Sequence, residues 1–171
     1  MAKEPLNATL TRHPMRNLKL DRIDRMLLEA LQQDARLTTA ELAELVNLSP
    51  SPCARRIRRL EQAGLITRYR AELDKARLGL MVTIFVQVRL SQHLQAQVEE
   101  FEQSVSHMPE VVQCHSVSGH FDYLLQVITA DIQAFEQWLR HFRQLKTIST
   151  VDSSFAIRTV KENGPLPLPI V

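Results

Sequence analysis

Cysteine is scarce in this sequence, with only Cys53 and Cys114 among 171 residues. We assign the two cysteines to separate domains, so we expect no disulfide between them and a reducing, cytoplasmic environment. Long apolar runs are also absent: none reaches the roughly 20 residues that cross a bilayer, and residues 1–18 lack the continuous apolar stretch of a signal peptide. The sequence therefore predicts neither membrane attachment nor export.

Aromatic residues make up only 5% of the chain, and the aromatic–basic run of RNA-recognition sheets is missing. This argues against a module that binds single-stranded RNA. An enzyme would need a nucleophile beside a base, or a metal site, and we find neither. Cys114 and His115 are adjacent, but neighbours in a strand point to opposite faces, so they cannot bind one ion. We expect no catalytic residue, no metal and no cofactor.

Charge is unevenly distributed, although the net charge is only +2. Residues 1–80 carry 15 Lys and Arg against 10 Asp and Glu, whereas residues 81–171 carry 6 against 9. This asymmetry suggests that the N-terminal part, the head, binds a polyanion and that the C-terminal part, the body, has a different function. We divide the chain into a loose N-terminal arm, a head, a linker, a body and a Pro-rich tail: residues 1–18, 19–73, 74–80, 81–162 and 163–171. Within the arm, Met15 is a second candidate for the translation start.

Three helices are predicted in the head. The first follows the N-cap candidate Asp21, with apolar residues spaced three and four apart. The second opens on a capping box at Thr38, and the third has Ser49 as its cap with a proline at its first position. Gly64 is placed to end the third helix, and residues 65–73 are a candidate two-stranded wing. Two helices joined by a short turn behind a supporting helix indicate a helix-turn-helix.

The body alternates strands and helices. Strands rich in Val, Ile and Phe are predicted at residues 81–89, 111–118, 123–129 and 148–160, with helices around 94–105 and 132–142. The order βαββαβ predicts an antiparallel four-stranded sheet with two helices on one face. The fold class is therefore α+β, with an N-terminal winged helix-turn-helix domain and a C-terminal ferredoxin-like βαββαβ domain. The tail, NGPLPLPIV, is predicted to be extended and to pack on a neighbour.

The third helix is the candidate reader of double-stranded DNA. A step of about 100° per residue places Cys53, Ile57 and Leu60 toward the first two helices, with Cys53 as a small buried hydrophobe. The opposite side is polar: Ser51, Arg55, Arg58 and Gln62. The residues nearest the helix start are expected to meet bases in the major groove: Ser51, Pro52 and Arg55. Three more arginines are expected to contact phosphates: Arg56, Arg59 and Arg68. The alternative is a charged helix face that is only solvated.

Residues 20–69 resemble the helix-turn-helix of the leucine-responsive regulator/AsnC family, the feast/famine regulators. The matching features, in order, are Leu20-Asp21, Asp24, Asp34-Ala35-Arg36, Leu42-Ala43, Leu48-Ser49-Pro50, Pro52-Cys53, Arg56-Ile57, Leu60-Glu61, Gly64-Leu65-Ile66 and Tyr69. In the body, the motif of Gly119, Asp122 and Tyr123 resembles the family's effector-binding domain. The likeness covers about residues 18–162. It implies a transcriptional regulator that dimerises through the body and often forms octamers.

The turn between the second and third strands of the body is the candidate effector site. Gly119 permits a backbone that exposes amides to a carboxylate, and Asp122 is placed to accept the α-ammonium of an amino acid. Ser118 and His120 complete the turn, and the resemblance adds Ser153 on the last strand as a weaker candidate. Relatives commonly carry an acidic or polar residue where this chain has His120, so the effector stays open. The alternative for Asp122 is simple capping of its turn.

Assembly is predicted from the first strand of the body, in which both faces are largely apolar. One face of the sheet is expected to pack on the helices, and the other is expected to be buried against a partner subunit. A monomer with tolerated surface apolar residues is the alternative. The sequence predicts a DNA-binding regulator. The family resemblance implies that its assembly or DNA affinity changes when an amino acid or related metabolite binds, and that it controls genes of amino-acid metabolism or transport.

Overall fold

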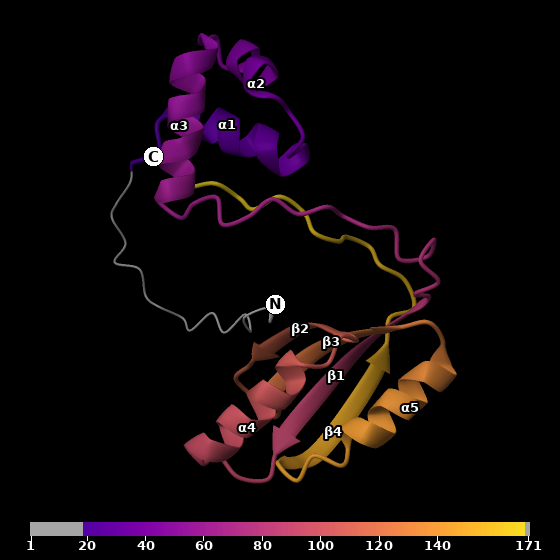
Figure 1. Cartoon of the computed structure of the whole chain (residues 1–171). Coiled ribbons are helices and arrows are strands. Elements are labelled where there is room, and N and C mark those ends of the chain that lie inside the picture. The colour runs from indigo at the N-terminus through magenta and orange to yellow at the C-terminus, as the bar shows by residue number, and fades with distance from the viewer. Residues whose placement is uncertain (1–18, 170–171) are drawn as a thin grey trace, which may run out of the picture. The chain divides into compact units, whose positions relative to one another are not determined.

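The computed structural model describes residues 19–169, so the predictions for the N-terminal arm and for Met15 lie outside the described residues. The chain forms two compact units (Figure 1). The head comprises the described residues up to Ala71 together with those from Asn163 onward, and the body spans Glu72–Glu162. The tail is thus part of the head unit. No helix within residues 19–169 is long and apolar enough to cross a membrane.

The head contains the three predicted helices: α1 (Arg22–Gln33), α2 (Thr39–Leu45) and α3 (Pro50–Gln62). The predicted capping boxes at the starts of α1 and α2 are both present, and each satisfies backbone N–H groups that a helix start leaves without partners. Ser49 is the N-cap residue of α3, but its side chain makes no capping hydrogen bond. The proline at the first position of α3 needs no N–H partner, which lowers the requirement for a cap.

Two apolar clusters hold the head together. The first lies among all three helices: Leu27, Leu42, Ala43, Val46 and Cys53. Cys53 is fully buried, as predicted for a small hydrophobe. The second cluster contains Leu20, Leu28 and Leu60, with Ile66 and Leu168 packed against it. The paired strands predicted for a wing at residues 65–73 are not formed, and this segment has no regular secondary structure. A hairpin of two short strands is marginally stable by itself.

The body has the predicted βαββαβ order. Its elements are β1 (Val82–Leu90), α4 (Gln95–Ser106), β2 (Val111–Ser116), β3 (Tyr123–Thr129), α5 (Ile132–Phe142) and β4 (Ile148–Phe155). The strands form one antiparallel sheet in the order β2-β3-β1-β4 (Figure 1). β4 ends earlier than predicted. Its last residue, Phe155, pairs with Ile84, and the Ala156 N–H donates to the Thr83 carbonyl at 2.9 Å. The neighbouring strand β1 begins at Val82, so it offers almost no further residues for β4 to pair with.

The two faces of the sheet differ in burial. On the face covered by α4 and α5, β1 contributes Ile84, Val86, Val88 and Leu90, which pack with aromatic residues of both helices. Burial alternates along β1 and β3, as expected for strands with one covered face. On the other face, Phe85 is 41% exposed and Leu124 is half-buried. Within the body, residues 72–162, the helices α4 and α5 pack on the opposite face, so the apolar residues on this face are candidates for contact with a partner.

Candidate nucleic-acid interface and effector turn

The orientation of α3 agrees with the predicted helical wheel. Cys53 and Leu60 are completely buried, whereas Ser51, Arg55 and Arg58 are exposed. Residues spaced three and four apart therefore divide α3 into an apolar face toward α1 and α2 and a polar face toward solvent. Pro52 is half-buried in the first turn. The exposed face is long enough to present several side chains to a groove.

The turn before α3 sets the helix against α2. Val46 ends α2, and Asn47 follows with a φ of +53°, a left-handed conformation that asparagine tolerates better than most residues. The Leu48 N–H then donates to the Ala43 carbonyl at 2.9 Å. This bond satisfies a carbonyl that the end of α2 leaves without a helical partner. The short, hydrogen-bonded turn holds α3 at a defined angle to α2.

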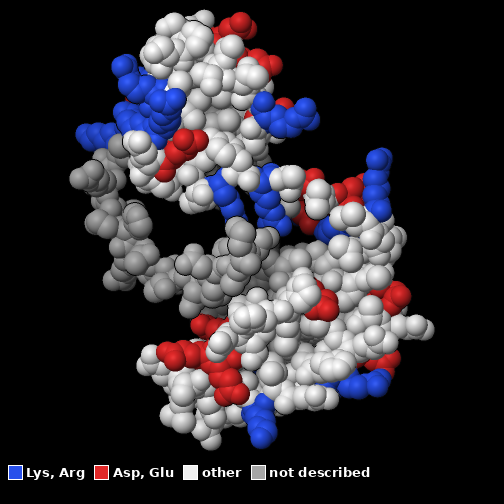
Figure 2. Space-filling view, viewed as in Figure 1, with Lys and Arg blue, Asp and Glu red and all other residues white. Residues whose placement is uncertain are grey.

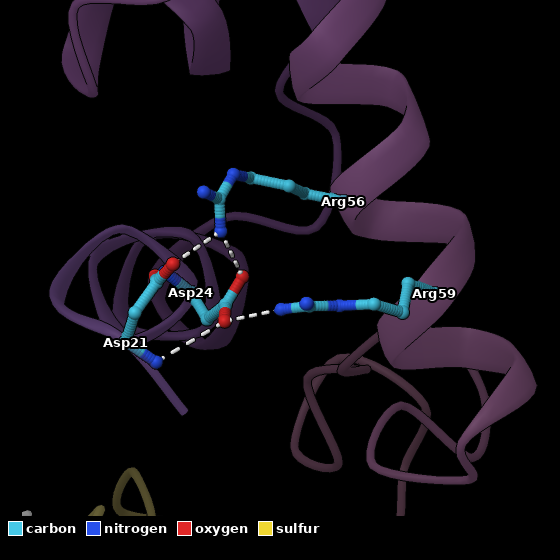
Figure 3. A network of polar contacts seen from close by, with 4 residues as sticks. All are labelled: Asp21, Asp24, Arg56 and Arg59. Atoms are coloured by element: carbon cyan, nitrogen blue, oxygen red, sulfur yellow. Dashed lines mark hydrogen bonds and ion pairs between the residues drawn. The ribbon is translucent and has the colours of Figure 1, made fainter. Parts of the chain in front are cut away.

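Two of the predicted phosphate-binding arginines form an ion-pair network with α1 (Figure 3). Arg56 Nη1 donates to Asp21 Oδ2 at 2.6 Å and to Asp24 Oδ1 at 2.9 Å, and Arg59 Nη2 donates to Asp24 Oδ2. Asp24 is completely buried and also accepts the Asp21 N–H at 3.2 Å. A buried carboxylate needs such partners. Arg56 and Arg59 therefore join α3 to α1.

The network alters the acid–base behaviour of its exposed members. Partial burial raises the pKa of the Asp21 carboxyl, but the Asp24 N–H and the Arg56 guanidinium outweigh it and hold that pKa below its ordinary value. Hydrogen bonds to Asp21 and Asp24 raise the pKa of Arg56. Both shifts favour the charged forms of the pair. The ion pair between Asp21 and Arg56 is therefore stable at neutral pH.

Arginines outside this network remain available for a ligand. Arg55, Arg58 and Arg68 are exposed, and none forms an ion pair with any residue between 19 and 169. Lys and Arg gather on one side of the head over α3 (Figure 2). The side chain of Arg59 is 45% exposed despite its ion pair. The head therefore presents a basic surface to which α3 contributes its outward face.

In the body, the predicted effector turn is open to solvent. Gly119 has a φ of +122°, which L side chains rarely adopt, and Ser118 and His120 are exposed. The amides of these three residues donate no hydrogen bond within residues 19–169. Arg89 on β1 donates through Nε to the His120 carbonyl at 2.8 Å, and its guanidinium lies 5.9 Å from the centroid of the Phe121 ring. A charged arginine thus holds the turn beside β1.

Asp122 closes this turn onto the end of β1. Its Oδ2 accepts the Leu90 N–H at 2.7 Å, its Oδ1 lies 2.8 Å from His93 Nε2, and its own N–H donates to the Val88 carbonyl at 2.9 Å. The hydrogen bond with His93, helped by the Leu90 N–H, outweighs desolvation and lowers the pKa of the Asp122 carboxyl. The Asp122 carboxylate therefore favours its ionised form, and it links the turn to the end of β1 through Leu90 and to His93.

Ser153 is not brought into this turn. It pairs with Val86, a fully buried residue on the helix-covered face of the sheet, and its hydroxyl is buried with no hydrogen-bond partner among the described residues. Cys114 and His115 pair with Leu125 and Leu124 respectively. Successive residues in a strand face opposite sides, so the two candidate metal ligands point apart. Within residues 19–169 no group of three metal-ligating side chains occurs.

Sequence reasoning missed three contacts of these sites. It recognised Asp21 as a helix cap and did not foresee the buried role of Asp24 between two arginines. It also missed Arg89 and His93 beside the turn. The available signal for Arg89 was a charged residue near the end of a strand that has no other charged residue. No pattern in the sequence around His93 indicates that it contacts Asp122, which lies 29 residues later.

Comparison with known proteins gives these elements an identity. A family model described as winged helix-turn-helix DNA-binding matches residues 20–67, and one described as the Lrp/AsnC ligand binding domain matches residues 83–166. The chain belongs to the Lrp/AsnC family of transcriptional regulators. This Lrp/AsnC regulator is thus a DNA-binding protein of a non-enzymatic family, and the predicted family, fold class and absence of an enzymatic activity are confirmed.

Three relatives illustrate the similarity. The proline dehydrogenase transcriptional activator of Rhizobium radiobacter is 37% identical over 85% of this chain and 94% of the relative. The leucine-responsive regulatory protein of Escherichia coli is 42% identical over 70% of this chain and 73% of its own length. The crystal structure of an L-Met complex of a transcriptional regulator from Neisseria meningitidis has 36% identity and a TM-score of 0.83, covering 86% of this chain and 96% of that chain.

Proposed function

We propose that this regulator reads double-stranded DNA with the exposed face of α3 and that an amino acid or related metabolite controls its DNA affinity or assembly. The observation that carries the proposal is the division of α3 into a fully buried apolar face and an exposed face bearing Ser51, Arg55 and Arg58. A helix supported from behind, with free arginines in front, has the form of a major-groove reader. DNA binding also implies a cytoplasmic location.

The arginines of α3 divide their tasks. Arg55 lies in the first half of the helix, is exposed and forms no ion pair among the described residues, so it is the candidate for bidentate contact with guanine. Ser51 and Pro52 lie beside it at the start of α3. Arg58 and Arg68 are the candidates for phosphate contacts. Arg56 and Arg59 bind carboxylates of α1 and so hold α3 against it. The exposed part of Arg59 also adds positive charge that attracts the phosphate backbone of DNA.

Two substitutions at one position test this assignment. Arg55→Ala removes both charge and hydrogen bonds, whereas Arg55→Lys keeps the charge and loses the bidentate geometry. On a duplex selected from a randomised pool, we expect both variants to lose about 1–3 kcal/mol of discrimination at one base position. Arg59→Ala should instead weaken binding to all sequences alike and reduce the salt dependence of binding. If Arg55→Lys keeps the full sequence preference, Arg55 contacts phosphate and does not read a base.

The effector is proposed to bind at the turn of residues 118–122. The free amides of Ser118, Gly119 and His120 supply donors for a carboxylate, and Asp122 supplies an anion for an ammonium group. A carboxylate has about four lone-pair sites, so Asp122 retains acceptor capacity beyond its bonds to Leu90 and His93. The relative from Neisseria meningitidis was crystallised as an L-Met complex, which supports an amino acid as the class of ligand. Ser153, whose buried hydroxyl lies on the helix-covered face of the sheet, is not part of this proposed site.

Asp122→Asn tests the effector site. Losing the charge of one partner in a partly buried site costs about 2–5 kcal/mol, so we expect calorimetry against the common amino acids to show binding to the parent and none to the variant. DNA binding without effector should be unchanged, because the head is a separate unit. If Asp122→Asn binds the same amino acid as tightly as the parent, Asp122 only links the turn to β1 and does not contact the effector.

Assembly is proposed to use the uncovered face of the sheet. Phe85 on β1, together with Leu124 and Ile128 on β3, forms an apolar surface that a second copy can bury by a twofold contact. A symmetric dimer presents two α3 helices, which matches operators with two half-sites. Further association to an octamer is proposed from the family resemblance. The genes controlled are proposed to serve amino-acid metabolism or transport, as the names of several relatives indicate for those proteins.

A further inference from the structure

The C-terminal segment of this chain returns to the DNA-binding head. After β4 the chain remains with the body through Glu162 and joins the head at Asn163, so the backbone passes between the two units twice. The first passage lies between Ala71 and Glu72. In the sequence the tail looked like a segment that packs on a neighbour, but the described residues 163–169 pack on the head of their own chain. Two sets of contacts hold them there.

The polar set involves one side chain of α1. Gln32 Oε1 accepts the Leu166 N–H at 2.6 Å, and Gln32 Nε2 donates to the Leu166 carbonyl at 3.3 Å. A side-chain amide that pairs with both backbone groups of one residue acts as a short strand partner would. Because Gln32 is near the last turn of α1, this pair places the tail against that end of the helix.

The apolar set covers the second cluster of the head. Leu168 packs on Leu20, Leu28 and Leu60, which are 8%, 7% and 0% exposed. Leu166, two residues earlier, is 74% exposed. Prolines precede and follow both leucines in the segment GPLPLP, and proline lowers the conformational entropy that a segment loses when it docks. The tail therefore places one leucine in the cluster and leaves the other in solvent.

We propose that residues 163–169 are a structural part of the DNA-binding head, a strap that completes its second apolar cluster and ties it to the body by a second covalent passage. The strap binds on the side of Leu60, which is the buried face of α3, and leaves the exposed face with Arg55 uncovered. It acts by supporting the packing of α1 on α3 and does not block the reading face. An ion pair joins the first and last parts of the body. Its atoms, Lys75 Nζ and Glu162 Oε1, lie 2.6 Å apart.

The two leucines of the tail supply a matched pair of variants in the full-length protein. Leu168→Asp places a charge in the cluster, whereas Leu166→Asp makes the same change on an exposed side chain. We expect Leu168→Asp to speed hydrogen exchange of the α1 and α3 amides and to lower the melting midpoint of the head by at least about 4–8 °C, the shift that a small domain shows for each 1 kcal/mol of stability lost. Leu166→Asp should match the parent. The proposal is overturned if the two variants behave alike.

Truncation and dilution decide whether the strap belongs to its own chain. A chain ending at Glu162 should reproduce Leu168→Asp, and a chain ending at Pro169 should match the parent. Protection of the α1 amides should not change when the protein is diluted, because the strap is intramolecular. Loss of protection on dilution would show that a second copy supplies the tail and would overturn the proposal. Tighter DNA binding after truncation would also overturn it, because the strap would then cover the reading face.

Discussion

Neutralising the buried carboxylate of Asp24 should loosen the junction between α1 and α3. Asp24 is completely buried and accepts hydrogen bonds from Arg56, Arg59 and the Asp21 N–H. Asp24→Asn keeps the size of the side chain and an oxygen that can still accept the Asp21 N–H, so the helix cap survives. What the variant loses is the negative charge between two guanidinium groups. Arg56 and Arg59 then no longer share a buried anion.

The size of the effect follows from burial. Breaking a fully buried ion pair by removing one partner costs about 3–5 kcal/mol, most of it from the charge left without a partner. The side chains of Arg56 and Arg59 are 27% and 45% exposed, so water can solvate part of each guanidinium. We therefore expect Asp24→Asn to lower the free energy of opening the head by about 2–4 kcal/mol. Each 1.4 kcal/mol corresponds to about a tenfold change in an equilibrium constant.

Native-state hydrogen exchange measures this free energy without unfolding the body. The α1 and α3 amides of Asp24→Asn should exchange about 30- to 1,000-fold faster than those of the parent. Glu29→Gln makes the same chemical change at an exposed site on α1 and should shift the opening free energy by no more than about 0.5 kcal/mol. If Asp24→Asn exchanges as slowly as Glu29→Gln, the network does not hold the two helices together.

Three other outcomes are expected. Phe85→Asp, on the uncovered face of the sheet, should shift the protein to monomers in sedimentation at micromolar concentration, and an unchanged assembly would place the interface elsewhere. His93→Ala should raise the pKa of the Asp122 carboxyl toward its ordinary value in a carbon-13 NMR titration, and no change would show that His93 does not set it. Because the pKa of Asp21 is lowered in the folded head, its contribution to stability should be complete above about pH 4 and decline as the pH falls through the lowered pKa. Asp21→Asn should remove that acid dependence, and an identical pH profile in the variant would contradict the assignment.

The local features of the fold could be predicted from the sequence because each depends on neighbouring residues. The capping residues Asp21 and Thr38 lie three residues before the backbone N–H groups whose hydrogen bonds they accept, so both helix starts are visible in a short stretch of sequence. The strands of the body were recognised by their Val, Ile and Phe content and its helices by their apolar spacing, and these gave the order of the elements. The alternating burial along β1 and β3, which shows the covered face, comes from the structure. The end of β4 was misjudged because residues 156–160 have strand-like composition but extend past the first residue of their only neighbour, β1.

The candidate sites were only partly predictable, because their chemistry depends on distant partners. The helical wheel placed Arg56 and Arg59 near the polar side of α3 but carried no information about a carboxylate 32 and 35 residues earlier. The same limit applies to the tail, in which Leu168 and Leu166 are equivalent in sequence and differ in burial. A wheel gives the direction of a side chain, whereas its partner is fixed by tertiary packing.

Competition for a fluorescent duplex by full-length protein tests the central claim most directly. The labelled duplex is one recovered by selection from a randomised pool, and the competitors are the same unlabelled duplex, a random duplex and single-stranded RNA of equal length. The account predicts that the selected duplex competes at least about 1,000-fold better than the random duplex at physiological salt, that RNA competes no better than random duplex, and that Arg55→Ala erases much of this preference. Equal competition by random duplex or RNA, or a preference unchanged by Arg55→Ala, would contradict the assignment of α3 as a reader of duplex DNA.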